Sequence, residues 1–502
     1  MLTPSIFSGL SPCRKRAGIS RLAEILGSTN DVRCSWNESA VAGSRRHFLK
    51  SAASGFGYLA FAGLAHQAAT AENRGQLASR STHFPARARR VIFLCMNGGP
   101  SHLDLFDYKP KLQQVSQGKG LSGMPSPFRF SQQGESGAWV SEVCPGIARH
   151  VDDIAFIHSM QTDLPNHSQA FLQMHTGSFQ FIRPSLGAWT LYGLGTGNTN
   201  LPGFITINPP ADNGGARNYG SAFLPAIFQA TKIGTNQIPG FYAAFLGIDQ
   251  EPGPPLKNME NARITRREQR EQLDFIQALN SRKQQRDEFH PEIEGTIESF
   301  ELAFRMQSEL PDLLELKSET RATLDLYGIG SGLPTDRFGR QCLLARRMAE
   351  QGVRFIELTS PVAWDHHFML KNNLTQSCLA TDQPIAALLS DLKQRGMLEE
   401  TLVVWAGEFG RTPYAQSGTG RDHNNQGYTL WMAGGGVKGG IRYGATDELG
   451  AKAVENPVHI HDWHATLLHL LGLDHERLTF NYAGRNFRLT DVYGRVIKDL
   501  FI

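Results

Sequence analysis

TLVVWAGEFGRTPYAQSGTGRDHNNQG (Thr401–Gly427) combines a buried strand with a dense group of polar residues. Its apolar run, Leu402–Ala406, has the length and β-branched content typical of a strand buried on both faces. Gly407 ends the run, and Glu408–Pro413 is expected to follow as a loop. Because ligands bind beyond the carboxyl ends of strands in open parallel sheets, this loop is the first candidate for a functional site.

Two further predicted strands end in the same way. Arg90–Met96 leads into Asn97–Asp104 (NGGPSHLD), and Val353–Leu358 is followed by Trp364–His367 (WDHH). Strand and helix patterns alternate along the rest of the chain, which predicts an α/β fold with a mainly parallel sheet sandwiched by helices. We therefore expect the three polar clusters to meet at one edge of that sheet.

The first 71 residues read as a signal region. Ser44–Lys50 (SRRHFLK) resembles the twin-arginine export motif, and the uncharged stretch Ser51–Ala69 follows it. Ala69–Ala71 (ATA) has the pattern of an A-x-A cleavage site. A transmembrane anchor is the alternative, but the Gly, Ser and Ala content of the stretch favours a cleaved signal. We expect a periplasmic or otherwise exported protein, with the twin-arginine machinery as a partner and no stable membrane anchor.

The remaining chain divides into a lead-in at 72–89 and one domain at 90–502, with a charged helical insertion at 258–326. The net charge of +3 comes from the signal region, so the domain has no basic tail and nucleic acid is not an expected partner. The cysteines that follow the cleavage site form no CxxC pair, so a zinc–thiolate site is not expected either.

The three clusters at strand ends hold imidazole, carboxylate and amide groups without a thiolate. Such a set suits zinc, manganese or iron, and calcium or magnesium when oxygen ligands predominate. The sequence therefore predicts one or two divalent metal ions. The candidate metal-binding and supporting residues are Asn97, His102, Asp104, Asp365, His366, His367, Glu408, Asp422 and His423.

Five motifs together resemble an uncharacterised exported bacterial family that groups with the alkaline phosphatase/sulfatase-like superfamily. They are GGPSHLDLFDYKP, the cluster at Asp365, VVWAGEFGRTP, GRDHN, and the long segment HDWHATLLHLLGLDHERLTFNYAGRNFRLTDVYG. The resemblance runs from about Arg89 to Ile502. It implies an alkaline phosphatase-like fold and a metal-dependent site.

Within the superfamily pattern, Asp365 and His367 match an Asp…His metal pair, and His423 matches a later single His ligand. The resemblance thus implies one complete metal site. The second site departs from the pattern, because Asn97 stands where an Asp is expected and Glu408-Phe409-Gly410 where Asp-His-Gly is expected. His102 or Asp104 is a candidate to rebuild that site.

The nucleophile position implied by the same pattern falls near His167, with Ser168 beside it and no Cys or Thr in reach. Asn166 or Ser168 is expected to cap the helix that follows. Either Ser168 or a metal-bound water is then the attacking group. Arg411 is expected to bind the anionic ester oxygens bidentately.

Two functions follow from this reading. The first is an exported metal-dependent hydrolase of phosphate or sulfate esters, acting on a small anionic ester or on a sulfated or phosphorylated glycan. The second is a catalytically inactive periplasmic binding or scaffold protein that keeps a structural metal. The departures at Asn97 and Glu408 favour the second function, whereas Arg411 and Asp422 in glycine-rich loops favour the first.

Overall fold

A computed structural model describes residues 75–115, 123–234, 263–287, 291–330 and 332–502, and residues 72–502 form one compact unit. The twin-arginine motif, the uncharged stretch and the cleavage site lie outside the described residues, so their prediction is not addressed by the fold. Within the described part, no helix combines the length and the apolar character that crossing a bilayer requires.

The centre of the fold is a nine-stranded sheet whose strands run in the order β12-β4-β11-β8-β1-β7-β5-β6, with β15 added alongside β4. Its strands are β1 (Arg90–Cys95), β4 (Ile154–Gln161), β5 (Phe204–Ile207), β6 (Thr231–Ile233), β7 (Phe355–Thr359), β8 (Thr401–Ala406), β11 (Tyr428–Ala433), β12 (Ile441–Tyr443) and β15 (Val458–His459). The strand β1 is fully flanked, because it pairs in parallel with β7 on one side and β8 on the other.

This arrangement confirms that the three runs predicted as strands are neighbours in one sheet. Val91 lies beside Phe355 and Leu402, so the carboxyl ends of the three strands reach the same edge. The parallel order continues through β5 and β6. On the other side, β11 runs antiparallel to both β8 and β4, so the sheet is mainly rather than wholly parallel.

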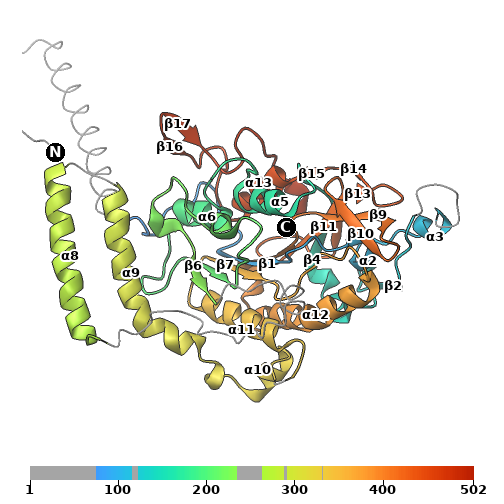
Figure 1. The fold of residues 1–502 in the computed structure, drawn as a ribbon, viewed down its shortest axis with the longest axis horizontal. Helices are drawn as coiled ribbons and strands as arrows, with labels where there is room; N and C mark the ends of the chain where they lie inside the picture. Colours follow the sequence, from blue (N-terminus) through green and yellow to red (C-terminus); the bar gives the residue numbers. More distant parts are fainter. Residues whose placement is uncertain (1–74, 116–122, 235–262, 288–290, 331) are drawn as a thin grey trace, which may run out of the picture. The chain divides into compact units, whose positions relative to one another are not determined.

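Helices cover both faces of the sheet (Figure 1). On one face lie α11 (Asp336–Glu350) and α12 (Leu370–Gln394), and on the other lie α5 (His167–Thr176), α6 (Leu186–Leu194) and α13 (Ile460–Leu470). The central strand β8 is buried along its whole length and β1 is buried from Val91 onward, since each is covered from both sides. The α/β fold predicted from the sequence is therefore observed.

The helix α5 begins where the sequence indicates. The side chain of Asn166 accepts a hydrogen bond from the Gln169 N–H and so caps the first turn. Gly177 ends the helix with a φ of 71°, a left-handed conformation that glycine adopts without strain. These two signals place His167 at the first position of the helix, facing the carboxyl edge of the sheet.

One prediction about local structure is wrong. The segment expected to be a loop after β8 instead forms a hairpin of β9 (Gly410–Gln416) and β10 (Gly420–Asn424). The turn between these strands has positive φ angles at Ser417 (52°) and Gly418 (75°), as tight hairpins require. The hairpin places His423 directly opposite Arg411, and that register builds the site.

The charged insertion is helical in its described part, and it comprises α8 (Arg266–Asp287), α9 (Pro291–Leu314) and α10 (Arg321–Leu326). Residues 258–262 lie outside the described ranges. Smaller elements complete the fold: α2 (His102–Leu105), α3 (Lys111–Val115), α4 (Pro145–Ala148), and the paired strands β2 (Phe130–Gln133) with β3 (Ala138–Ser141), β13 (Ala445–Thr446) with β14 (Ala453–Glu455), and β16 (Phe480–Tyr482) with β17 (Arg485–Phe487).

Candidate metal centre

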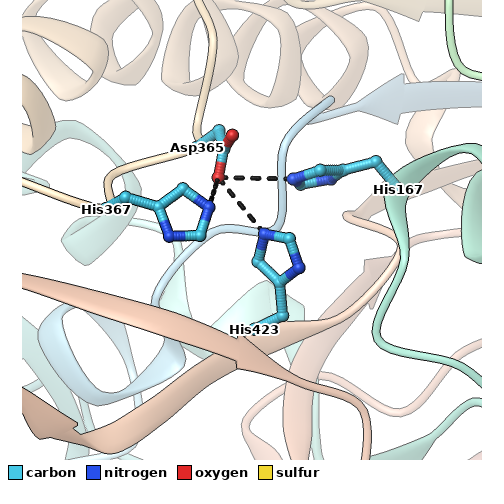
Figure 2. A group of neighbouring side chains, drawn as sticks. All are labelled: His167, Asp365, His367 and His423. Atoms are coloured by element: carbon cyan, nitrogen blue, oxygen red, sulfur yellow. Dashed lines mark ion pairs between the residues drawn. The ribbon is translucent and has the colours of Figure 1, made fainter. Parts of the chain in front are cut away.

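Four side chains converge at the carboxyl edge of the sheet (Figure 2). The carboxylate oxygen Oδ1 of Asp365 lies 2.8 Å from Nε2 of His367, 3.3 Å from Nε2 of His167 and 3.4 Å from Nε2 of His423. One ligand atom from each residue lies within 4.8 Å of all the others. The residues come from three separate segments: the loop after β7, the start of α5, and β10.

The outer nitrogen of each imidazole meets an oxygen acceptor. Nδ1 of His167 lies 2.6 Å from a carboxylate oxygen of Glu408, Nδ1 of His423 lies 2.8 Å from the Pro165 carbonyl, and Nδ1 of His367 contacts the side-chain oxygen of Gln416. These oxygens accept hydrogen bonds, so Nδ1 carries the proton in each neutral ring. The lone pair of every ring is therefore on Nε2, the atom that faces the centre of the cluster.

This donor set fits a divalent metal ion. The Nε2 atoms of His167 and His423 are buried and have no hydrogen-bond partner among the described residues. A tetrahedral site with bonds of about 2.1 Å has edges of roughly 3.4 Å, close to two of the distances between Nε2 atoms and the carboxylate oxygen of Asp365. Three imidazoles and one carboxylate, with no thiolate, suit a zinc-like or manganese ion.

The electrostatics of the cluster favour a cation. Burial lowers the pKa of His167, but its contact with Asp365, its hydrogen bond to Glu408 and the charges of both carboxylates outweigh burial and raise that pKa to about 9. Burial opposes ionisation of Asp365, yet its contacts with the imidazoles of His167 and His423 and the charge of Arg411 hold its pKa well below the usual range. An arriving metal ion would displace the proton of His167, so metal affinity should rise with pH.

Glu408 supports the cluster from behind rather than joining it. Its carboxylate is fully buried and accepts hydrogen bonds from the backbone N–H groups of Gly98 (3.1 Å) and Gly99 (3.2 Å) as well as from His167. A carboxylate that holds the outer nitrogen of a ligand imidazole fixes the tautomer and the orientation of the ring. The sequence predicted that Glu408 completes or supports a metal site. In the structure it contacts the ligand candidate His167 and supports the site through that ring.

Arg411 is completely buried, and its guanidinium binds oxygens of the protein itself. It donates to Asp365 Oδ1 at 2.6 Å, to the Gly99 carbonyl at 2.8 Å and to the Arg421 carbonyl at 3.2 Å, and it also contacts the Gly98 carbonyl. Burial lowers its pKa, while the charge of Asp365 raises it. Arg411 thus orients Asp365, and it is not free to bind an ester as the sequence suggested.

A buried ion pair that the sequence analysis did not identify anchors the hairpin. Arg421 on β10 binds both carboxylate oxygens of Asp104, at 2.7 and 3.1 Å, and both side chains are fully inaccessible. Burial alone would raise the pKa of Asp104, but the charge of Arg421 lowers it. Asp104, a candidate ligand by sequence, therefore fixes β10, the strand that carries His423.

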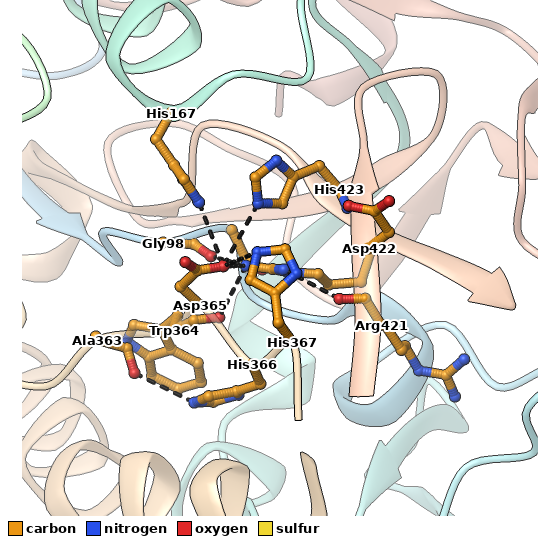
Figure 3. A network of polar contacts seen from close by, with 12 residues as sticks. Gly98, His167, Ala363, Trp364, Asp365, His366, His367, Arg421, Asp422 and His423 are labelled. Carbon is orange, nitrogen blue, oxygen red and sulfur yellow. Dashed lines mark hydrogen bonds and ion pairs between the residues drawn. The ribbon is translucent and has the colours of Figure 1, made fainter. Parts of the chain in front are cut away.

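Two other predicted residues lie away from the cluster. The ring of His102 is buried, with Nε2 3.0 Å from the Gly450 carbonyl and Nδ1 packed beside Gly410. The ring of His366 points away from its two neighbours, toward the Ala363 carbonyl (Figure 3). Burial lowers the pKa of His366 to about 4, so it is a neutral core residue.

Three polar side chains, those of Ser168, Asn213 and Asn97, form a hydrogen-bonded row. The Asn213 amide donates to Asn97 Oδ1 at 3.1 Å, and the Ser168 hydroxyl donates to Asn213 Oδ1 at 3.3 Å. Asn97 was predicted as a metal ligand and Ser168 as a nucleophile, and the structure joins both through Asn213. The sequence analysis did not identify Asn213, although it lies in the segment that follows β5, a strand parallel to β7.

His167 completes the cluster although the sequence analysis did not name it as a ligand. The signal was available, since the superfamily pattern pointed to its position as that of the nucleophile. Its neighbour Ser168 is exposed, whereas the ring of His167 is largely buried between Asp365 and Glu408. The direction of the first turn of α5 decides which of the two side chains faces inward, and periodicity alone does not show this.

Comparison with solved structures finds enzymes that are similar in structure at low sequence identity. The lipoteichoic acid synthase LtaP from Listeria monocytogenes is 9% identical, with a TM-score of 0.35 over 82% of this chain and 78% of its own. The PsFucS1 sulfatase from Pseudoalteromonas sp. is 12% identical, with a TM-score of 0.34 over 77% of this chain and 68% of its own.

The alkaline phosphatase from the Antarctic bacterium TAB5 is 10% identical, with a TM-score of 0.30 over 71% of this chain and 94% of its own. No curated protein sequence matches the chain. One family does match, over almost the entire described domain. The chain belongs to the family described as "Protein of unknown function (DUF1501)", which matches residues 88–501.

Proposed function

We propose that this protein is an exported, metal-dependent hydrolase of phosphate or sulfate esters. The observation that carries the proposal is the convergence of three imidazole Nε2 lone pairs and the carboxylate of Asp365 at the carboxyl edge of the sheet. His167, Asp365, His367 and His423 would hold one divalent ion. Such an ion polarises an ester oxygen and makes water acidic enough to attack near neutral pH.

The protein's own groups set the geometry of this chemistry. Glu408 keeps the proton of His167 on Nδ1, and Arg411 holds the carboxylate of Asp365 in place. Asn97 precedes Gly98, whose N–H binds Glu408, and its side chain accepts a hydrogen bond from Asn213. Glu408 already accepts hydrogen bonds from His167 and from the backbone, so it does not serve as a ligand of a second metal ion. We therefore propose a single metal ion rather than two.

Water is the attacking group that the geometry supports. The hydroxyl of Ser168 donates to the amide oxygen of Asn213, and an amide cannot act as a general base. A serine nucleophile needs such a base or direct activation. Ser168→Ala should therefore keep at least about a third of the wild-type kcat, whereas complete loss of activity in a folded, metal-loaded variant would assign the attack to Ser168.

The deciding experiment measures metal content and hydrolysis on the same purified protein. We expect about one equivalent of a divalent metal, and hydrolysis of aryl phosphates or aryl sulfates that is lost with a chelator and restored by metal. Protein that binds metal and hydrolyses neither ester would instead be the binding or scaffold protein. The full burial of Arg411 is the observation that favours this second function, because a buried Arg411 does not bind the anionic ester oxygens as the sequence predicted.

Export is the second part of the proposal, and it rests on Ser44–Lys50 and the uncharged stretch that follows. A protein exported after folding can acquire its metal in the cytoplasm and carry it across the membrane. Fractionation of cells that produce the full chain tests this: the mature protein should appear in the periplasm.

A further inference from the structure

Two buried thiols lie in contact outside the candidate metal centre. The sulfur atoms of Cys144 and Cys378 are 3.8 Å apart, and the two residues are only 3% and 1% exposed. Both are free thiols in this structure. They are 234 positions apart in the chain, so it is the fold that brings them together.

The two other cysteines of the described chain do not form such a pair. Cys95 lies on β1 and points to the same side of the sheet as Phe93, whose ring packs against His175 of α5. Cys342 belongs to α11, which covers the opposite face. The sheet therefore separates Cys95 from Cys342.

Contacts that involve no sulfur hold Cys144 and Cys378 against each other. Cys144 directly precedes α4, and Cys378 lies in α12, one turn before Asp382. The carboxylate of Asp382 accepts hydrogen bonds from the N–H groups of Gly146 at 2.6 Å and Ile147 at 2.8 Å. A side chain at Gly146 would come within 2.7 Å of Asp382 Oδ2, so glycine permits this close approach. These hydrogen bonds fix the start of α4, and with it Cys144, on α12.

The separation of the two sulfurs is close to what a disulfide requires. An S–S bond is about 2.05 Å long, so the sulfurs need to approach each other by roughly 1.8 Å. Rotation about the Cα–Cβ bond of each cysteine moves its sulfur while the backbone stays in place. We therefore expect the bond to close with the hydrogen bonds between Asp382 and α4 intact.

Closing the bond oxidises the pair by two electrons. A small-molecule or protein disulfide accepts these electrons by thiol–disulfide exchange and leaves as two thiols, which carry the two protons. The attacking species is a thiolate. The hydrogen bond to the Cys378 sulfur and burial raise the pKa of the Cys144 thiol well above its usual value, so the folded dithiol should be oxidised slowly.

We propose that Cys144 and Cys378 form a disulfide after export, and that this bond fastens α4 to α12. Disulfides persist in the periplasm and are rare in the cytoplasm, so this inference rests on the export part of the proposed function and not on hydrolysis. The bond joins positions 234 residues apart, and a link across so long a loop restricts the unfolded chain.

The bond would also lie beside the loop that carries two of the candidate metal ligands. Ser377 is the neighbour of Cys378, and its hydroxyl lies 3.3 Å from Nε2 of His366. His366 stands between Asp365 and His367 in the chain. Fastening α12 at Cys378 therefore restricts the helix that this loop contacts.

Peptide mapping of protein from two compartments tests for the bond. Protein purified from the periplasm is denatured, alkylated with N-ethylmaleimide without a reductant, and digested. We expect a peptide pair that links Cys144 to Cys378, with Cys95 and Cys342 alkylated. Protein retained in the cytoplasm by lysine replacement of the twin arginines should have all of these cysteines alkylated. Free Cys144 and Cys378 in periplasmic protein, or a link to another cysteine, would overturn the proposal.

Urea unfolding tests whether the bond fastens the fold. A reductant should lower the unfolding midpoint of the exported protein by about 1 M, and Cys144→Ala should show no dependence on the reductant. Cys342→Ala is the matched control, because it removes another buried thiol but keeps the pair, and it should respond to the reductant as the wild type does. A bond that is present without any effect of the reductant on the midpoint would refute the fastening role.

The failure of this inference is distinct from the failure of the proposed function. Fractionation that finds no exported protein refutes export and, with it, a bond formed after export. Exported protein in which both thiols remain free keeps export and refutes the disulfide. Purified cytoplasmic protein incubated with glutathione disulfide tests the geometry by itself: linkage of Cys144 to Cys378 supports it, and linkage elsewhere or none overturns it. No result depends on metal binding or on hydrolysis.

Discussion

The substitution Glu408→Gln tests whether a buried carboxylate controls metal binding through His167. In the native protein this carboxylate accepts three hydrogen bonds: from Nδ1 of His167 at 2.6 Å and from the N–H groups of Gly98 and Gly99 at 3.1 and 3.2 Å. A glutamine amide offers one oxygen and one NH₂ in the same space. It therefore cannot satisfy all three donors at once.

Each orientation of the amide has a cost. If its NH₂ faces His167, the ring must accept at Nδ1, so its proton moves to Nε2 and blocks the metal-facing lone pair. If its NH₂ faces Gly98 and Gly99, buried donors remain unsatisfied, at about 1–3 kcal/mol. Replacing a residue that orients a metal ligand typically lowers affinity about 10- to 100-fold, so we expect a loss of about 1.4–2.7 kcal/mol in metal binding.

The assay is a competition titration against a fluorescent chelator, paired with urea unfolding of the metal-free protein. Asp382→Asn is the matched control, because this largely buried carboxylate also accepts two backbone N–H groups, from Gly146 at 2.6 Å and Ile147 at 2.8 Å, but binds no histidine in the described part of the chain. The control should lose stability and keep its metal affinity. If Glu408→Gln binds metal within twofold of the wild type, the inferred role of Glu408 is refuted.

Three further predictions concern the cluster, the core and export. His423→Ala should lower metal content and abolish hydrolysis while the protein still folds; full metal occupancy would exclude His423 as a ligand. Burial lowers the pKa of His464 to about 3, so the unfolded chain, with a pKa near 6.5, binds the proton first as pH falls. The free energy of unfolding of the wild type should therefore fall by about 2 kcal/mol between pH 7 and pH 5 because of His464. Urea titrations should show a smaller fall for His464→Gln, and an equal fall in both proteins would contradict this assignment. Changing Arg45 and Arg46 to lysine should keep the full-length protein in the cytoplasm. Normal secretion of this variant would show that the export machinery does not recognise the arginine pair.

The sequence alone determined the fold class and the location of the site. The predicted strands ending at Met96, Leu358 and Ala406 are rich in apolar residues because both faces of the sheet are covered, and this pattern is visible without a structure although Arg354 and Glu357 interrupt the second strand. A glycine or a polar cluster follows each run, so the edge that carries the chemistry could be predicted. Asp365, His367 and His423 were identified in this way, and the structure brings them together.

Tertiary structure alone decided which polar side chains face one another. His167 and Ser168 are adjacent in the chain, but the cap at Asn166 sets the first turn of α5 so that only the imidazole turns inward. In the sequence, Glu408 looks like a metal ligand and Arg411 like a residue that binds the ester anion. In the structure both are buried beyond β8, where Glu408 holds His167 and Arg411 holds Asp365. Contacts between residues hundreds of positions apart depend on strand order and register, which hydrophobic periodicity does not encode.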